Sequence, residues 1–347
     1  MRIMDCSEVL AAVTPSEAVD ALRRALIDGF DPATDPQRQK VGLPHGEMHL
    51  LPSALDGAVG VKVLGIQPAG SDIDVPLVQG SYLLMGGETL TPEVVMDAAA
   101  LTEIRTPAVA VAGVLDRLRA SSEPLECVIV GAGVQGRAHA RTVEDVLRGV
   151  REVSVTFVSR REPADLAYPW AQLGSDAADE ALGKAGLVVL ATSAGEPVVV
   201  DRQLRPDATV LAVGAHTADT RESHEDVLRG AQVIVEDVGA ARREAGDVAI
   251  AVEKGALAWD DVVAVARRGE APIAQIAKDF GISEACLHRW LKIADREDGR
   301  GQPASAADAD DMAAQLREAH KRIKLLEQEA EVMRRAVGYL SRDANPK

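Results

Sequence analysis

The sequence predicts an α/β protein with a parallel sheet at its centre, an α+β domain before that sheet and an all-α region after it. Two observations support this prediction. The segment from Cys127 to His139 runs from four apolar residues into the pattern Gly-x-Gly-x-x-Gly and then into a helix-compatible stretch. Further along, strand-like apolar runs alternate with helix-like segments as far as Gly246, which is the pattern of βαβ units. We therefore expect a Rossmann-type parallel sheet.

The glycine pattern predicts a dinucleotide site, because each glycine has a distinct task. Gly131 supplies the backbone angles of the tight turn, Gly133 lets a pyrophosphate approach the main chain, and Gly136 lets helix and strand pack closely. The phosphates would bind free N–H groups at the helix N-terminus, where Val134 and Gln135 lie. The alternative is a structural turn in another kind of α/β domain.

The residues after the second predicted strand bear on the choice of cofactor. An NAD site usually places an acidic residue there for the ribose 2′-hydroxyl, whereas arginines suit a 2′-phosphate. This chain has Ser159, Arg160 and Arg161 at that point, with Glu162 next to them. The segment favours NADP over NAD and leaves both open.

The elements before the glycine turn follow from hydrophobic periodicity and from turn residues. We expect a helix over residues 7–30, with Ser16 preceding its apolar pattern, and a polar loop over residues 31–44. Three short strands should follow at 48–51, 59–64 and 77–85, with a turn at Gly86 and Gly87. Residues 92–118 should contain one or two helices, interrupted at Pro107.

The strands of the parallel sheet are expected in apolar runs that alternate with helices. These runs are residues 127–130, 153–158, 187–191, 210–213 and 233–235. The intervening helices suit the crossover connections that parallel strands need.

Composition narrows the functional classes. The chain is 47% apolar, as in a globular protein, and its net charge of −16 disfavours broad affinity for nucleic acid or an anionic membrane. Three cysteines, far apart, form neither a disulfide framework nor a metal-ligand spacing, so we expect no metal site and a cytoplasmic location. We also expect no membrane segment, because no apolar run reaches the length that spanning requires.

The negative charge lies almost entirely in the first 255 residues, so the remainder has the character of a separate module. Within it, Pro272 opens one predicted helix, Gly281 makes a turn and Ser283 caps a second helix. This is helix-turn-helix spacing, and the outward positions of the second helix suit a DNA groove and its phosphates: Glu284, His288, Arg289 and Lys292. An ordinary pair of packed helices is the alternative.

A heptad pattern follows a polar linker. Nine apolar residues step by four and three without a break from Met312 to Leu340. This periodicity predicts a coiled coil, and β-branched residues at a with Leu or Met at d favour a parallel dimer. A helix packed on its own domain is the alternative.

Residues 1 to about 256 resemble the ornithine cyclodeaminase/mu-crystallin family. The resemblance rests on the segments at 60–63 (Gly-Val-Lys-Val), 101–106 (Leu-Thr-Glu-Ile-Arg-Thr), 131–136, 191–197, 213–222 and 244–247. It implies an NAD(P)-dependent enzyme that handles a small amino acid, oxo acid or cyclic imine. It also places Thr192 and Gly214 in loops at the cofactor.

The same resemblance implies catalytic residues. Arg105 and Arg38 would bind a substrate carboxylate, and Lys62 would donate or accept a proton beside the imine. Cyclodeaminases carry an aspartate where this chain has His216. We therefore expect dehydrogenase or imine-reductase chemistry rather than cyclodeamination.

Residues from about 259 to 341 resemble the DNA-binding protein encoded by the first frame of insertion-sequence transposases. The resemblance rests on residues 260–268, 273–283, 287–291 and 322–329, and no D-D-E catalytic domain accompanies them. We expect this module to replace the C-terminal segment that is usual in the ornithine cyclodeaminase/mu-crystallin family. The expected domains are a substrate and dimerisation domain (1–120), a nucleotide-binding domain (121–256), a helix-turn-helix (257–297), a linker (298–309) and a leucine-zipper coiled coil (310–341).

Three functional hypotheses follow. The first is a homodimeric oxidoreductase with an appended DNA-binding module. The second is a transposase-like DNA-binding protein that carries an inactive, truncated enzyme remnant. The third is a non-functional fusion.

Overall fold

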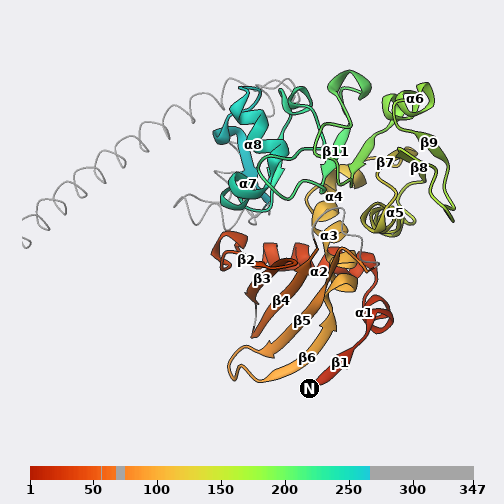
Figure 1. The fold of residues 1–347 in the computed structure, drawn as a ribbon. Coiled ribbons are helices and arrows are strands. Elements are labelled where there is room, and N and C mark those ends of the chain that lie inside the picture. The colour runs from red at the N-terminus through yellow and green to blue at the C-terminus, as the bar shows by residue number, and fades with distance from the viewer. Residues whose placement is uncertain (56, 68–74, 266–347) are drawn as a thin grey trace, which may run out of the picture. The chain divides into compact units, whose positions relative to one another are not determined.

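The computed structural model describes residues 1–55, 57–67 and 75–265 (Figure 1). All of them belong to one compact unit, Met1–Glu270. The predicted linker and coiled coil and most of the predicted helix-turn-helix, with Glu284, His288, Arg289 and Lys292, lie outside the described residues. Among the described residues, no helix is long and apolar enough to cross a bilayer.

The N-terminal part is built on a six-stranded sheet with the order β1-β6-β5-β4-β3-β2. Only β1 and β6 pair in parallel; the other pairs are antiparallel. The strands are β1 (Arg2–Met4), β2 (Gln39–Leu43), β3 (Gly46–Leu55), β4 (Ala58–Ile66), β5 (Val78–Gly86) and β6 (Pro92–Asp97).

Burial alternates along β4, as expected when one face of a sheet is covered. Gly60, Lys62 and Leu64 are buried, whereas Val61 and Val63 are only partly buried. The covered face packs on α3, which contacts both β4 and β5. Lys62 therefore lies between two buried residues on the covered face of the sheet. A buried lysine is unusual and indicates a functional site.

Four helices accompany this sheet: α1 (Cys6–Ala12), α2 (Pro15–Ile27), α3 (Ala98–Ala112) and α4 (Leu115–Arg119). The single helix predicted over residues 7–30 is wrong, because the chain is extended at Val13 and Thr14. Thr14 and Glu17 form a capping box, and Pro15 occupies the first helical position. These residues start a new helix, so the N-cap is Thr14 rather than Ser16.

Two further expectations for this part are corrected. The predicted loop over residues 31–44 contains a 3₁₀ helix (Pro32–Thr34) and the edge strand β2, which pairs with β3. The segment expected to begin a helix at residue 92 is strand β6, and the helix starts only after Asp97, whose side chain accepts from Ala100 N at 2.8 Å. That helix continues through Pro107, which is buried in its interior.

The second part contains the predicted Rossmann-type sheet. Its order is β11-β10-β7-β8-β9 and all neighbours are parallel. The elements are β7 (Leu125–Val130), α5 (Val134–Leu147), β8 (Val153–Ser159), β9 (Trp170–Gln172), α6 (Asp176–Lys184), β10 (Leu187–Leu190) and β11 (Thr209–Ala212). The short strand β9 was not predicted.

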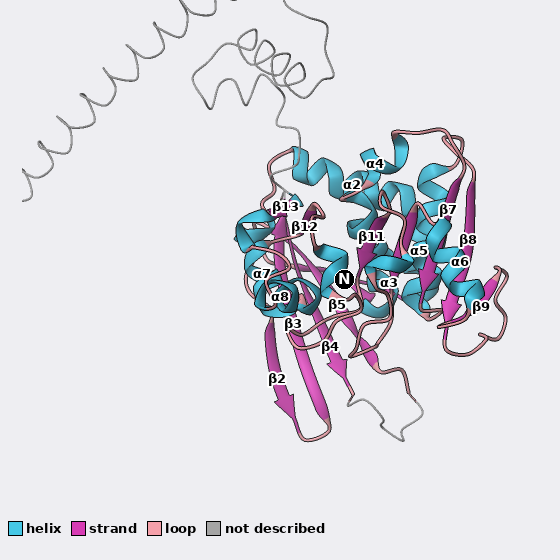
Figure 2. Cartoon of the chain, turned by 90° about the horizontal axis from the view of Figure 1, so that it is seen from above, coloured by secondary structure: helices cyan, strands magenta, loops and turns pink. Residues whose placement is uncertain are grey.

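Helices cover both faces of this sheet (Figure 2). Ile129 and Phe157 point to the face covered by α5, where they share a core with residues of α2 and α3. Val128 and Val158 point to the opposite face and pack with Leu182 of α6. The first core therefore joins the two sheets' helices into one body, which fixes α3 beside the nucleotide-binding half.

The last described segment holds α7 (Val238–Glu244), α8 (Gly246–Glu253) and a two-stranded parallel sheet of β12 (Val233–Val235) and β13 (Val262–Ala264). Residues 233–235 were predicted as a strand of the main sheet, but they pair with β13 instead. Further 3₁₀ helices are Asp201–Gln203, Glu225–Leu228 and Trp259–Asp261.

The junction predicted at residue 257 is also corrected. Val262 is buried in a cluster with Leu228, Val248 and Ala251, and Trp259 packs against that cluster. Burial against the enzyme-like body, together with strand pairing, keeps residues 257–264 in the first unit.

Candidate active site

The glycine turn between β7 and α5 has a steric reason for two of its three glycines. Gly131 has a φ of +107°, which favours glycine, and a methyl group on Gly136 would overlap the Gly131 carbonyl oxygen. A methyl group on Gly133 would meet nothing within 4 Å. The open side of the turn therefore lies at Gly133, as a site for a pyrophosphate requires.

The N-terminus of α5 is arranged to receive an anion. Gly133 is its N-cap residue and has no side chain to satisfy the N–H groups of the first turn. Val134 beside it is 61% exposed. The helix dipole and these N–H groups favour negative charge at this point.

A buried carboxylate holds the loops that follow β10 and β11. Glu222 is fully buried and accepts hydrogen bonds from Thr192 N at 2.6 Å, Thr192 Oγ1 at 2.7 Å and Gly214 N at 2.6 Å. Burial raises the pKa of this carboxyl group, and the three donors act in the opposite direction. Glu222 thus fixes two predicted cofactor residues at the carboxyl edge of the sheet, where α/β proteins bind ligands.

Asp247 holds the main chain at Glu222 and Ser223 in place. It lies in the first turn of α8, and its Oδ1 accepts from Glu222 N at 3.0 Å, Ser223 N at 2.7 Å and Ser223 Oγ at 2.6 Å. The roles of both acids were not predicted from the sequence. Each lies in a segment that carried the family resemblance, but no local pattern shows which groups it contacts.

The segment after β8 lines a pocket of about 520 Å³ next to the glycine turn. Ser159 Oγ donates to Arg161 O at 2.6 Å and accepts from Trp170 Nε1 at 2.9 Å, which fixes the path of the loop. The pocket is lined by Ala132, Ser159, Arg160, Arg161, Glu162 and Pro163. The two arginines predicted to select the cofactor therefore line the same pocket as Ala132 of the glycine turn.

Lys62 occupies the covered face of β4 with an exposure of only 6%. Its Nζ donates to Thr102 Oγ1 of α3 at 3.3 Å. Burial, and then the positive charges of Arg105 and Arg38, lower the pKa of Lys62 to about 7. Both protonation states of this lysine are thus populated near neutral pH.

Two guanidinium groups lie near Lys62. The three predicted catalytic residues therefore lie together, although they come from distant parts of the chain. Arg105 comes from α3, and Arg38 comes from the residue before β2, where it pairs with Glu244 of α7 at 3.0 Å. Burial lowers the pKa of Arg105 as well. The Nε atoms of both arginines are buried without a partner among the described residues, so each can still donate to an anion.

Two further groups, His216 and Glu236, interact electrostatically with this cluster. Partial desolvation, followed by the charges of Arg38 and Lys40, lowers the pKa of His216, so this imidazole is neutral at pH 7. The charge of Glu236 acts in the opposite direction on Lys62 and Arg105 and favours their protonated forms. Glu236, which directly follows β12, was not predicted from the sequence.

The comparisons with known proteins agree with this geometry. The family model described as ornithine cyclodeaminase/mu-crystallin family matches residues 3–278. The chain belongs to this family. The match confirms the resemblance of the enzyme-like part and extends past the junction predicted at residue 257.

Three similar proteins carry the names of reductases or dehydrogenases. Delta(1)-pyrroline-2-carboxylate reductase of Paracoccus denitrificans is 28% identical over 71% of this chain and 78% of its own length. Alanine dehydrogenase of Archaeoglobus fulgidus is 25% identical over 75% of this chain and 81% of its own. Mouse ketimine reductase mu-crystallin is 31% identical over 56% and 62%.

Solved structures share the fold. Thermococcus litoralis Delta(1)-pyrroline-2-carboxylate reductase, in complex with NADH and L-proline, aligns with a TM-score of 0.64 at 23% identity, covering 77% of this chain and 85% of its own. An archaeal alanine dehydrogenase dimer with bound NAD aligns with a TM-score of 0.64 at 24% identity, covering 77% and 84%. These likenesses support the predicted fold of residues 1–256.

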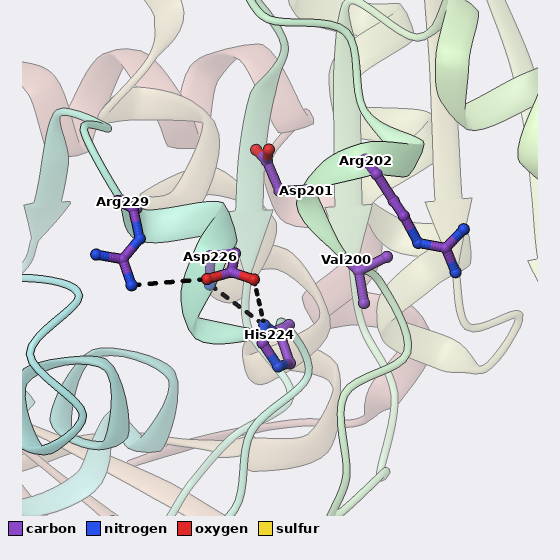
Figure 3. A pocket seen from close by; sticks show the side chains of 6 residues that line it. All are labelled: Val200, Asp201, Arg202, His224, Asp226 and Arg229. Atoms are coloured by element: carbon purple, nitrogen blue, oxygen red, sulfur yellow. Dashed lines mark hydrogen bonds and ion pairs between the residues drawn. The ribbon is translucent and has the colours of Figure 1, made fainter.

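A second pocket, of about 460 Å³, contains none of the predicted site residues (Figure 3). It is lined by Val200, Asp201, Arg202, His224, Asp226 and Arg229. Asp226 contacts His224 Nδ1 at 3.2 Å and Arg229 at 3.7 Å. The side chains of His224, Asp226 and Arg229 thus already contact one another.

The buried carboxylate of Glu222 gives a stability prediction. Glu222→Gln places an amide N–H₂ among three donors, so at least one of them loses its acceptor in a buried place. We expect the free energy of unfolding to fall by about 1–3 kcal/mol, measured by urea denaturation. Glu253→Gln on the exposed end of α8 is the control and should change little. Equal midpoints for the two variants would contradict this role.

Proposed function

We propose that this chain is an NAD(P)-dependent oxidoreductase that reduces a small, carboxylate-bearing imine, or catalyses the reverse oxidation of an amino acid. The observation that carries the proposal is Lys62, buried beside Arg105 and Arg38 in the same compact unit as an open glycine turn. The named activities of the relatives in pyrroline-carboxylate reduction, alanine dehydrogenation and ketimine reduction support the same class.

The residues of the nucleotide-binding half fit a dinucleotide. The first-turn N–H groups of α5 would hold the pyrophosphate, with Gly131, Gly133, Val134, Gln135 and Gly136 around it. The loops of Thr192 and Gly214 would border the nicotinamide end, and Ser159, Arg160 and Arg161 would surround the adenosine ribose. The bound cofactor supplies or accepts a hydride. Two arginines at the ribose pocket favour NADP over NAD.

The cationic cluster would handle the substrate. Arg105 and Arg38 each have a buried N–H that no described residue accepts from, and this group would bind a carboxylate, for which a guanidinium is well shaped. Lys62 would donate a proton beside the imine nitrogen during reduction and accept it during oxidation. A neutral His216 at the cyclodeaminase aspartate position favours this chemistry over loss of ammonia.

The open face of the N-terminal sheet supports the predicted homodimer. Val61, Leu83 and Val95 align across β4, β5 and β6 on the face opposite Lys62, and all three are only partly buried. Contiguous apolar surface of this kind marks interaction sites. A second copy of the chain is the proposed partner, and one of the aligned structures is a dimer.

Cofactor binding tests the proposal without a substrate. NADPH should bind saturably, followed through its fluorescence. Gly133→Ala adds a methyl group in open space at a φ of −74° that alanine readily adopts, so the fold should survive. The methyl group occupies the expected pyrophosphate position, and the Kd should rise about tenfold or more, equivalent to about 1.4 kcal/mol.

Removing both arginines at the ribose pocket, with Arg160→Ala and Arg161→Ala together, should weaken NADPH but leave NADH unchanged. Arg205→Ala, far along the chain on the exposed surface, is the matched control. The proposal fails if neither nucleotide binds at millimolar concentration.

Lys62 gives the catalytic prediction. In the direction of reduction the ammonium form is needed, so the rate should fall as pH rises through about 7. Lys62→Met should lower turnover of Delta(1)-pyrroline-2-carboxylate by roughly 10²–10⁴-fold without changing the Kd of NADPH. Lys184→Met, on the exposed surface of α6, should behave as the wild type. Undiminished turnover by Lys62→Met would exclude the assignment.

A DNA-binding role for the C-terminal residues is a second proposal, which rests on the helix-turn-helix spacing and heptads of the sequence alone. In a gel shift the full chain should retard duplex DNA that carries insertion-element ends, and less so as salt rises. Arg289→Ala combined with Lys292→Ala should abolish the shift. Retardation that is equally strong with and without these side chains would contradict the proposal, as would no shift at all. In either case the oxidoreductase proposal would be unaffected.

A further inference from the structure

Lys62 is connected to the glycine turn through a single residue of α3, Thr102. Lys62 Nζ donates to Thr102 Oγ1 at 3.3 Å, and Gln135 Nε2 donates to the main-chain oxygen of the same threonine at 3.3 Å. Gln135 lies between Gly133 and Gly136 in the first turn of α5. The side chain expected to move a proton and the turn expected to bind pyrophosphate therefore meet at one residue.

The direction of the Lys62 hydrogen bond is fixed by a third contact. Thr102 Oγ1 donates its only hydrogen to Ala98 O at 2.7 Å, one turn back in α3. Towards Lys62 the hydroxyl can therefore act only as an acceptor. It occupies one N–H of the lysine in either protonation state, and no other described residue forms a hydrogen bond with Nζ.

Gln135 has an unusual environment for a residue in the first turn of a helix. Its Oε1 is buried and has no hydrogen-bond partner among the described residues, while its Nε2 is spent on Thr102 O. A buried amide oxygen without a partner is disfavoured. The side chain is thus held in this orientation by its contact with α3 rather than by the best satisfaction of its own polar atoms.

We propose that Thr102 and Gln135 are positioning residues, which together fix the Nζ of Lys62 relative to the nucleotide-binding turn. The inference rests on the proposed function for the role of Lys62. Thr102 sets the orientation of the amine, and Gln135 anchors the turn of α3 that carries Thr102 to the turn that binds the cofactor. Hydrogen bonds of 3.3 Å, such as those made by Lys62 and Gln135 to Thr102, can shorten when ligands bind.

The consequence for protonation has a definite sign. A hydroxyl that accepts from Lys62 stabilises the ammonium more than the neutral amine. Removing the hydroxyl should therefore lower the pKa of Lys62 further and enlarge the amine fraction in mildly acidic solution. A purely structural role of Thr102 in α3 would not change the titration of this one lysine.

The experiment measures the reactivity of Lys62 directly and needs no substrate. The full chain is labelled with acetic anhydride between pH 5 and 9, and modification of Lys62 is quantified by mass spectrometry, with exposed Lys184 as the internal reference. Thr102→Val should raise the labelling of Lys62 at pH 6 about three- to fivefold, because a lower pKa leaves more free amine. Thr102→Ser, which keeps the hydroxyl, should match the wild type.

Gln135→Met keeps the length of the side chain and removes both amide groups. It should raise Lys62 labelling in the same direction, about twofold, while Lys184 is unchanged. Should Thr102→Val fail to fold, as judged by circular dichroism, Thr102→Ala removes the hydroxyl without adding bulk and carries the same expectation.

The proposal is overturned if the valine or alanine variant and the serine variant give the wild-type labelling profile. Saturable NADPH binding, measured on the same samples, distinguishes this outcome from failure of the proposed function. Binding with unchanged labelling refutes only the positioning role, whereas the enzyme is refuted if the wild type binds neither NADPH nor NADH.

Discussion

The site depends on the burial of a positive charge among other positive charges. Lys62 is on the covered face of a sheet, with Arg105 and Arg38 nearby. Such an arrangement disfavours folding unless something of opposite charge compensates it. Glu244 pairs with Arg38, and Glu236 favours the charged forms of Lys62 and Arg105, but the Nε atoms of both arginines are buried without a partner among the described residues. In the proposed function, a carboxylate substrate would complete this electrostatic balance.

The nucleotide-binding half solves the opposite problem, because it must gather donors around an anion. The first turn of α5 exposes main-chain N–H groups, and Glu222 ties together the loops of Thr192 and Gly214 on the neighbouring strands. Asp247 holds Glu222 in turn through main-chain contacts. A shared apolar core that includes residues of α2, α3 and α5 keeps the two halves in register. In the proposed function, rigidity on both sides would allow a cofactor and a substrate to meet at Lys62.

The sequence predicted those features whose causes are local. The glycine turn, four strands of the parallel sheet (β7, β8, β10 and β11) and the family were found because apolar runs and motif residues lie together in the chain. Two local features were also missed, namely the pairing of β2 with β3 across a short turn and the capping box at Thr14 that starts α2. Residues 233–235 were misplaced because their partner strand, β13, is distant in the chain. The acids Glu222 and Asp247 escaped assignment for the same reason, because their partners are 8 to 30 residues away.

A crystal structure of the full chain with NADPH and L-proline would show whether cofactor and substrate bind on either side of Lys62. We predict that the pyrophosphate lies on the first turn of α5, with the 2′-phosphate beside Arg160 and Arg161. The proline carboxylate should lie within hydrogen-bonding distance of the Arg105 guanidinium, and the ring nitrogen should face Lys62. A cofactor bound away from the glycine turn, or a carboxylate that contacts neither Arg105 nor Arg38, would contradict this arrangement.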